Sequence, residues 1–183
     1  MVSAGASHTD SSGHYRIDGL PEGLYVILGS TGQIGGSERG GSGLIIFAGS
    51  GLRPSKARTV AVKGSSDYAG VDIIIPLIGV REVSGIVTGP DGHRLNHGLV
   101  RLYPTGEPRF PLSTPVQADG TFSFHRIPQD RYTVLLEEAT DMAVTPKSNG
   151  GLTVIQKYGP VSADIEVANA DLTDVKLVVA PVK

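Results

Sequence analysis

Three histidines in the second half of the chain could together bind a metal ion. His93 and His97 have a spacing that occurs among metal ligands, and His125 follows later in the same half. However, His93 and His97 fall in a polar stretch, and His125 alternates with Phe124, which directs the histidine to the solvent side of a strand. We therefore expect no metal site.

Other residue types that perform chemistry also lack the context that catalysis needs. Glu137, Glu138 and Asp141 could act as acid and base, but no neighbouring group distinguishes one carboxylate from another, which favours a solvated face. The segment 49–51 begins like a dinucleotide-binding loop, yet Pro54 stands where the third glycine should be. Nucleophile-elbow, zinc-protease and P-loop motifs are absent from the sequence. We expect a protein that is not an enzyme and needs no cofactor.

Composition excludes further classes of partner. The 183 residues include 16 Lys and Arg against 18 Asp and Glu, a net charge of −2, so no basic cluster is available to neutralise nucleic-acid phosphates. No apolar stretch approaches the roughly 18 residues that span a bilayer, so we expect no membrane insertion. Cysteine is absent, which excludes disulfides. The first residues lack the features of a signal peptide, so any export signal is expected outside this chain.

The elements that would position any site are strands. Apolar residues recur with a period of two, and Gly and Pro together make up 37 residues, which favours many short strands joined by tight turns. The clearest strand patterns are Tyr15–Ile17, Val60–Val62, Leu99–Leu102, Phe122–Phe124 and Ile165–Val167. Glu137 to Val144 is the one segment that could form a short helical turn. The sequence therefore predicts an all-β fold.

The chain contains an internal repeat. A shift of 107 residues aligns five positions without a gap: Gly13, Tyr15, Leu20, Pro21 and Tyr25 with Gly120, Phe122, Ile127, Pro128 and Tyr132. The later parts match as well, 60–62 with 165–167 and 71–73 with 175–177. We expect two domains, 1–78 and 79–183, joined by a short link at Pro76 to Val80.

The two copies are unequal in length. The second copy opens with two strand patterns, Val83–Val87 and Gly98–Tyr103, before its Asp119-Gly120 turn, whereas the first begins only shortly before Gly13. The first copy is thus expected to lack its N-terminal strands, which would leave an unpaired edge and an uncovered apolar face. Either the chain is a fragment, or another chain fills the gap.

These motifs resemble a known family. The second copy carries Val83-x-Gly85-x-Val87, Pro90-Asp91-Gly92, Asp119-Gly120-x-Phe122-x-Phe124 and Ile127-Pro128 with Tyr132, and the first carries Gly19-Leu20-Pro21-x-Gly23-x-Tyr25. They resemble carboxypeptidase regulatory-like modules, including the CnaB-type versions of bacterial surface proteins. The resemblance implies two tandem transthyretin-like, or prealbumin-like, β-sandwiches. The second copy departs from the pattern at Gln129-Asp130-Arg131, where the loop glycine is replaced, so this turn must be built differently.

Several conspicuous residues are better explained by structure than by ligand binding. Tyr25 and Tyr132 follow a proline turn, and we expect each hydroxyl to tie down that turn, as in the tyrosine corner of other sandwiches. Asp10 and Asp119 lie at tight turns, where a carboxylate commonly accepts backbone N–H groups rather than binding calcium.

Two features indicate association. Residues 29–43 are rich in Gly and Ser and run into Leu44, Ile45, Ile46 and Phe47, a flexible arm followed by an apolar strand. Ile74 lies within a run of three isoleucines, so it should face something other than its own core. The alternative is that these strands are covered by the neighbouring copy or by a loop.

The leading hypothesis is a non-catalytic structural protein that self-associates, as a filament or surface-array subunit, outside the cell or on its surface, with the periplasm as an alternative. Met1 to His8 or the segment 29–47 of another subunit would complete the first copy. The rival hypothesis is a glycan- or peptide-binding accessory module of a larger surface protein or an outer-membrane transporter. Tyr103, Phe110 and Tyr158 are its candidate contacts.

Overall fold

The computed structural model describes residues 3–31, 43–49, 51–64, 67–76, 78–144 and 151–182. Its regular elements are strands, apart from one 3-10 helix, η1 (Pro54–Lys56). The prediction of an all-β fold is confirmed. Within these residues no helix is long and apolar enough to cross a membrane.

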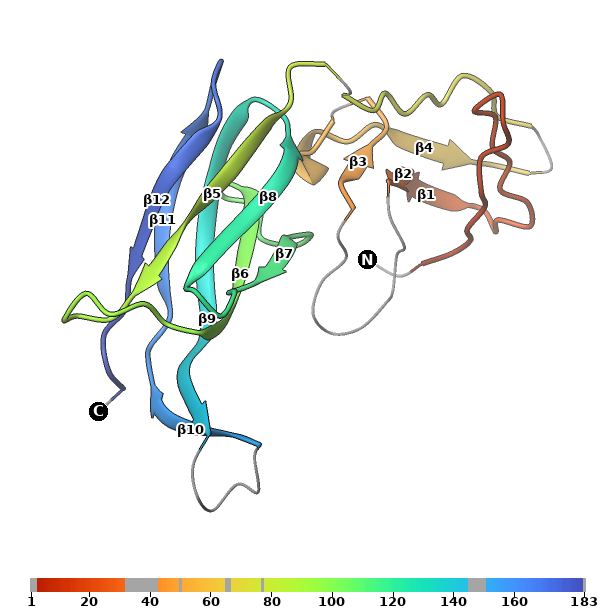
Figure 1. The fold of residues 1–183 in the computed structure, drawn as a ribbon. Coiled ribbons are helices and arrows are strands. Elements are labelled where there is room, and N and C mark those ends of the chain that lie inside the picture. Colours follow the sequence, from red (N-terminus) through yellow and green to blue (C-terminus); the bar gives the residue numbers. More distant parts are fainter. Residues whose placement is uncertain are drawn as a thin grey trace.

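The second half of the chain forms two packed sheets (Figure 1). The larger sheet contains β6 (His97–Pro104), β7 (Leu112–Pro115), β9 (Asp130–Val144), β10 (Leu152–Lys157) and β11 (Val161–Val167), in the order β10-β9-β6-β7 with β11 also on β9. The smaller sheet contains β5 (Arg81–Thr88), β8 (Thr121–Ile127) and β12 (Leu172–Val178), in the order β12-β5-β8. Apolar residues of both sheets alternate inward and form a single core. This half is a β-sandwich.

Strand β5 is the centre of the smaller sheet, because it pairs in parallel with β12 and antiparallel with β8. Its inward positions are Val83, Gly85 and Val87, which are buried. Gly85 must be a glycine, since a Cβ atom there would collide with the carbonyl oxygen of Val175 on β12. The sequence of β5 is thus matched to a position between two close neighbours.

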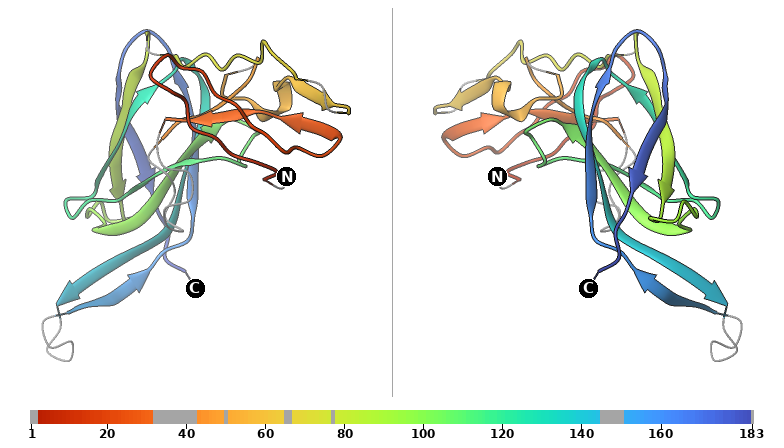
Figure 2. Two further views of the ribbon diagram at one scale, coloured as in Figure 1. Left: turned by 90° about the vertical axis from the view of Figure 1, so that its right-hand side faces the viewer. Right: turned by 90° about the vertical axis from the view of Figure 1, so that its left-hand side faces the viewer.

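Strand β9 belongs to the sandwich for its first half and leaves it in its second half. Residues up to Leu136 pair with β11, and residues from Thr140 onward pair with β10. Between them, Glu138 has a positive φ of 53°, and the pairing with β6 shifts register at the same place. The bulge lets β9 and β10 extend away from the sandwich as an arm (Figure 2). The expectation that 137–144 could form a helical turn is wrong, because strand pairing takes these residues.

The first half forms two short antiparallel pairs, β1 (Gly23–Val26) with β4 (Thr59–Val62) and β2 (Leu28–Ser30) with β3 (Ile45–Phe47). Tyr25 lies opposite Val60 in the first pair, as Tyr132 lies opposite Ile165 in the second half. The aligned residues therefore share a strand register as well as a sequence pattern. The division into domains 1–78 and 79–183 stays a prediction.

Two expected strands of the first half take part in no strand ladder. Tyr15–Ile17 corresponds to β8, and residues 71–76, which contain the isoleucine run, correspond to β12. In the second half both of these strands pair with β5. Among the described residues, no strand of the first half stands where β5 stands in the second half, so the two segments have no strand to pair with. This is the physical reason for the difference.

Candidate functional site

The two unpaired segments, residues 14–20 and 71–76, frame a gap that we name the open strand position. Both segments keep the alternation of a strand: Tyr15 and Ile17 are half-buried while Arg16 is exposed, and Val71 and Ile73 are half-buried. Within the described residues, no backbone-to-backbone hydrogen bond joins 15–20 or 71–76 to the rest of the chain. Apart from the carbonyl of Val71, which accepts the hydroxyl of Tyr15, their main-chain N–H and C=O groups are therefore available to another strand.

The corresponding residues of the second half show what the missing strand would cover. Phe122 on β8 and Leu177 on β12 are each 1% exposed, and Val175 is also buried. Their counterparts Tyr15 and Ile73 are only half-buried. The first half of the chain, which we call the first unit, therefore has a less complete core than the second half, which we call the second unit.

A side-chain hydrogen bond connects the two sides of the open strand position. The hydroxyl of Tyr15 donates to the carbonyl oxygen of Val71. Burial, and then the charge of Asp72, raise the pKa of Tyr15 above its ordinary value, so the hydroxyl keeps its proton and remains a donor at neutral pH. A side-chain hydrogen bond thus joins two segments whose counterparts are joined by β5 in the second half.

Neighbouring segments contact the walls of the open strand position. A Cβ atom on Gly29 of β2 would lie 3.3 Å from Cδ1 of Ile73, so this wall lies directly on β2. A Cβ atom on Gly5 would lie 2.8 Å from Cγ2 of Ile17, so the N-terminal segment is in contact with the other wall. Only a residue without a side chain fits at that contact.

Large apolar side chains are exposed beside the open strand position. Ile74 is 81% exposed and Ile78 is 95% exposed, and Leu24 and Ile75 are also exposed. We expected Ile74 to face away from its own core, and its exposure agrees. Apolar surface of this kind on a short, incompletely paired unit favours contact with another chain.

The first unit is anchored to the sandwich through Arg53. Its guanidinium donates two hydrogen bonds to the carboxylate of Asp130, from Nε to Oδ2 at 3.0 Å and from Nη2 to Oδ1 at 2.6 Å. Nη1 also lies 3.5 Å from Oε1 of Glu107, and the backbone N–H of Ser55 donates to Oε2 of Glu107 at 3.0 Å. The bidentate geometry fixes the orientation of η1 and the adjoining chain relative to β9.

This anchor was missed by the sequence reasoning, although one signal pointed to it. Asp130 stands where the first copy has Gly23, the position at which the second copy departs from the family pattern. The replacement supplies the carboxylate that Arg53 needs. The hydrogen bond to Asp130 is the largest of the influences that raise the pKa of Arg53, so the guanidinium stays charged.

The expected association strand 44–47 is used inside the chain. Leu44, Ile46 and Phe47 are buried, Ile45 is half-buried, and Phe47 contacts Phe110 with ring centroids 5.5 Å apart. These residues and Phe110 therefore join the first unit to the sandwich and are not a free surface, which corrects their placement as intermolecular contacts. The alternative of a strand covered by the neighbouring copy is what the structure shows. Residues 32–42 of the predicted arm lie outside the described residues.

The aromatic residues expected to contact a glycan do not form a platform. Phe110 contacts Phe47, Tyr103 is half-buried on β6, and Tyr158 is buried with its hydroxyl donating to Asp141 at 2.7 Å. Sugar stacking needs an exposed ring face, which buried Tyr158 lacks, and a glycan contact at Tyr103 or Phe110 stays a prediction.

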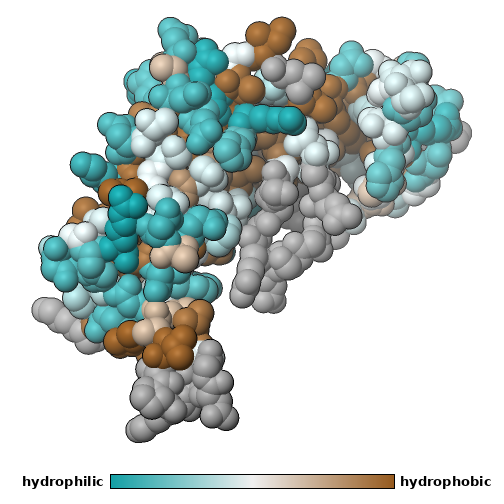
Figure 3. All heavy atoms as spheres, viewed as in Figure 1, coloured by the Kyte–Doolittle hydropathy of each residue, from teal (hydrophilic) through white to brown (hydrophobic). Residues whose placement is uncertain are grey.

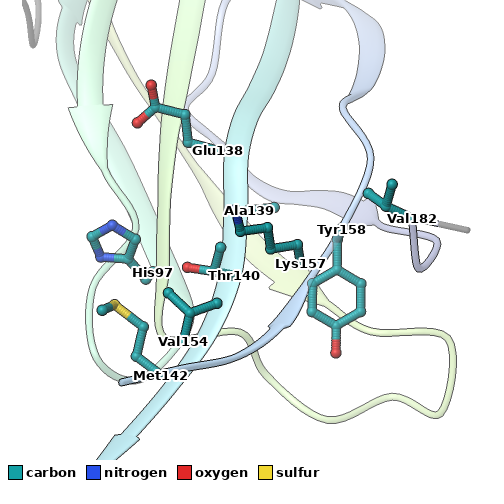
Figure 4. Close-up of a pocket in the computed structure, with 9 residues that line it drawn as sticks. All are labelled: His97, Glu138, Ala139, Thr140, Met142, Val154, Lys157, Tyr158 and Val182. Atoms are coloured by element: carbon teal, nitrogen blue, oxygen red, sulfur yellow. The ribbon is translucent and has the colours of Figure 1, made fainter. Parts of the chain in front are cut away.

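A shallow hollow of about 350 Å³ lies at the base of the β9–β10 arm (Figure 4). Its lining residues are His97, Glu138, Ala139, Thr140, Met142, Val154, Lys157, Tyr158 and Val182. In the close-up, His97, Met142 and Val154 gather on one side, and Tyr158 and Val182 lie on the other. The lining combines apolar side chains with the polar groups of His97, Glu138 and Thr140.

Two of the three histidines considered as metal ligands have separate partners. His93 contacts Asp91 and Asp141, and His125 on β8 lies 3.4 Å from Glu82. Among the described residues no group of three metal-ligating side chains was found. Glu137, Glu138 and Asp141 were expected on a solvated face. Glu137 forms an ion pair with Arg101 at 2.7 Å, and Asp141 contacts His93 and Tyr158.

The structural roles expected of two tyrosines and two aspartates are confirmed. The hydroxyl of Tyr25 donates to the carbonyl oxygen of Pro21 at 2.7 Å, and that of Tyr132 donates to Pro128 at 2.8 Å. Asp10 accepts the backbone N–H groups of Ser12 and His14, and Asp119 accepts that of Thr121.

Comparison with known proteins gives only distant likenesses. No known family and no curated protein matches the chain. A proposed carbohydrate-binding protein of Pseudomonas aeruginosa matches at 16% identity with a TM-score of 0.37, over 56% of this chain and 88% of that one. The major pilin subunit of Bacillus cereus matches at 13% identity and 0.40, over 90% of this chain and 40% of the pilin.

A streptococcal ancillary pilin matches at 13% identity with a TM-score of 0.36, over 90% of this chain and 47% of the pilin. The chain thus spans less than half the length of either pilin. The chain has distant structural similarity to pilin subunits and to a proposed carbohydrate-binding protein.

Proposed function

We propose that this protein is a non-catalytic structural subunit of the cell surface that self-associates by strand addition at the open strand position. The observation that carries the proposal is the pair of unpaired, strand-like segments, 14–20 and 71–76, whose counterparts in the same chain both pair with β5. A strand inserted between them would satisfy both sets of main-chain groups at once.

The chemistry of the incoming strand can be derived from β5. The inward residues of β5 are Val83 and Val87, with Gly85 between them, and Gly85 allows the close approach of β12. A donor for the first unit therefore needs small or β-branched residues on its inward face. Met1 to His8 contains Ala4, Gly5 and Ala6 in succession, so a strand from this segment meets the requirement.

The N-terminal segment already contacts one wall of the position in its own chain, at Ile17. Exchange of this segment between chains would keep that contact and add the missing ladder. Because donor and acceptor are different surfaces, each chain would use its neighbour's acceptor and offer its own donor. Such a heterologous contact propagates into a filament unless its rotation closes a ring.

The proposal is tested by the solution mass of the 183-residue chain, measured by light scattering after size exclusion across the micromolar range. We expect the mass to exceed the monomer's 19.1 kDa and to rise with concentration. Deleting residues 1–8, or changing Ile73→Asp in the acceptor wall, should return the chain to monomer. Val178→Asp changes an exposed valine of the second unit and serves as the control, with assembly unaffected.

A monomer at every concentration would refute the proposal. Assembly that persists in both the deletion and the acceptor variant would refute strand addition at this position. Both variants alter the first unit, so the amide spectrum of the second unit is recorded for each to check that this unit stays folded. It should be unchanged. A synthetic peptide with the sequence of residues 82–88, added in excess, should compete for the acceptor and dissociate the assemblies.

A further inference from the structure

A cluster of four polar side chains lies where the β9–β10 arm leaves the sandwich. His93, in the turn between β5 and β6, places Nδ1 against Oδ1 of Asp91 and Nε2 2.7 Å from Oδ2 of Asp141 on β9. The hydroxyl of Tyr158, just after β10, donates to the same Oδ2 of Asp141 at 2.7 Å. The cluster therefore connects the β5–β6 turn to both strands of the arm.

A second contact from the same turn holds the next residue of the arm. The side-chain amide of Asn96 donates from Nδ2 to the carbonyl oxygen of Met142 at 2.7 Å and accepts the backbone N–H of Met142 at Oδ1, at 3.0 Å. Asp141 and Met142 come soon after the bulge at Glu138, at which β9 leaves the sandwich. The base of the arm is thus fixed at two adjacent residues.

The contacts of His93 depend on its proton count. A neutral imidazole has one N–H and can donate to only one carboxylate, whereas the imidazolium has two and can donate to both. The charged and titratable groups that face the ring are Asp91 from its own turn, Asp141 from β9 and Tyr158 from the chain after β10. Only the protonated form satisfies Asp91 and Asp141 together.

The neighbouring groups favour that protonated form. The hydrogen bond to Asp91, and then the one to Asp141, raise the pKa of His93 above its ordinary value. The hydrogen bond from His93 lowers the pKa of Asp91. Burial, and then the hydrogen bond to Asp141, raise the pKa of Tyr158 to about 12, so its hydroxyl donates to Asp141 at any pH near neutrality.

We propose that His93 is a pH-sensitive latch that tightens the attachment of the β9–β10 arm to the sandwich when protonated and loosens it when neutral. The arm carries apolar side chains on its surface, at Val144, Leu152, Val154 and Ile155 (Figure 3). Protonation therefore sets how rigidly this apolar surface is presented. The latch is independent of the open strand position, which lies in the first unit.

The sign of the pH dependence follows from the direction of the shift. Because the pKa of His93 is higher in the folded chain, the latch contributes fully below the unfolded value of about 6.5 and is lost as pH rises through the folded value. His93 is 38% exposed and Asp141 20%, so solvent screens the pair. We expect release to change local exchange rates by about two- to fivefold.

The test is amide hydrogen exchange of residues 139–144 and 152–157 in the full chain at pH 6 and pH 8, corrected for intrinsic rates. In the unmodified protein, protection should be about two- to fivefold lower at pH 8 than at pH 6. His93→Gln should remove the pH dependence and keep protection at the lower level. His125→Gln is the matched control, because His125 is exposed and faces a single carboxylate, and it should behave as the unmodified protein.

Equal corrected protection at both pH values in the unmodified protein would overturn the proposal, as would a pH dependence that survives in His93→Gln. A second measurement does not rely on a variant. The imidazole signals of the unmodified protein, followed by NMR from pH 4 to 9, should show His93 titrating above the ordinary value of about 6.5. Titration at or below that value would also overturn the proposal.

Discussion

Replacing Arg53 with methionine should weaken the attachment of the first unit to the sandwich, because it leaves two carboxylates without their cation. Arg53, Asp130 and Glu107 have side chains that are 22%, 28% and 13% exposed, so they are neither fully solvated nor fully buried. Methionine keeps much of the aliphatic length of the side chain and removes both hydrogen bonds to Asp130.

The magnitude can be bounded from this exposure. Removing one partner of a fully buried pair costs about 3–5 kcal/mol, whereas exposed pairs contribute about 0.2–1 kcal/mol. For a bidentate pair of intermediate exposure we expect a loss of about 2 kcal/mol, close to the value of hydrogen bonds to charged groups. In a double-mutant cycle with Asp130→Asn, the coupling energy should be about 1–2 kcal/mol.

The assay is urea unfolding followed by circular dichroism, since the chain has no tryptophan, combined with amide exchange of β1 and β4. Arg16→Met is the matched control, because the ion pairs of Arg16 with Asp18 and Asp67 are well exposed, and its unfolding midpoint should not change. A coupling energy below about 0.3 kcal/mol would refute the reasoning, since it lies within the additivity error of independent sites.

Two further predictions concern single groups. Tyr132→Phe should lower the free energy of unfolding by about 1–2 kcal/mol, because it leaves the half-buried carbonyl of Pro128 without its donor, and the same change at the more exposed Tyr25 should cost less. Thermal unfolding of the two variants makes the comparison, and equal losses would contradict it. Burial raises the pKa of Glu107, but hydrogen bonds from Ser55 and the charge of Arg53 outweigh it and lower the pKa below its ordinary value. The stabilisation from ionised Glu107 is therefore present above the unfolded pKa of about 4.3 and is lost as pH falls through the folded pKa. The free energy of unfolding in urea should therefore drop less steeply in acid for Glu107→Gln than for the unmodified protein.

Much of the fold could be predicted from local patterns. Alternation of apolar residues marked the strands, and the tyrosine after each proline turn was correctly expected to tie down that turn, since the contact spans only four residues. The alignment of the copies also placed Tyr25 and Tyr132 in equivalent registers. Such features depend on neighbours in sequence, so the sequence carries them directly.

Errors arose where the outcome depended on distant partners. Residues 15–17 and 73–75 have strand patterns, but a strand forms a ladder only when a neighbour lies beside it, and no described strand lies beside them. Leu44 to Phe47 reads as an exposed apolar strand, yet Phe110, more than 60 residues later, covers it.

The amino-acid sequence by itself determined the strand class and the repeat, because each is a property of spacing along the chain. Only the tertiary structure decided that Arg53 would meet Asp130 and that His93 would meet Asp141. Such contacts join residues 77 and 48 positions apart, and their geometry depends on how the elements between them pack. The open strand position belongs to both levels: the sequence patterns of its two segments mark them as strands, and the fold places those segments without a ladder partner among the described residues.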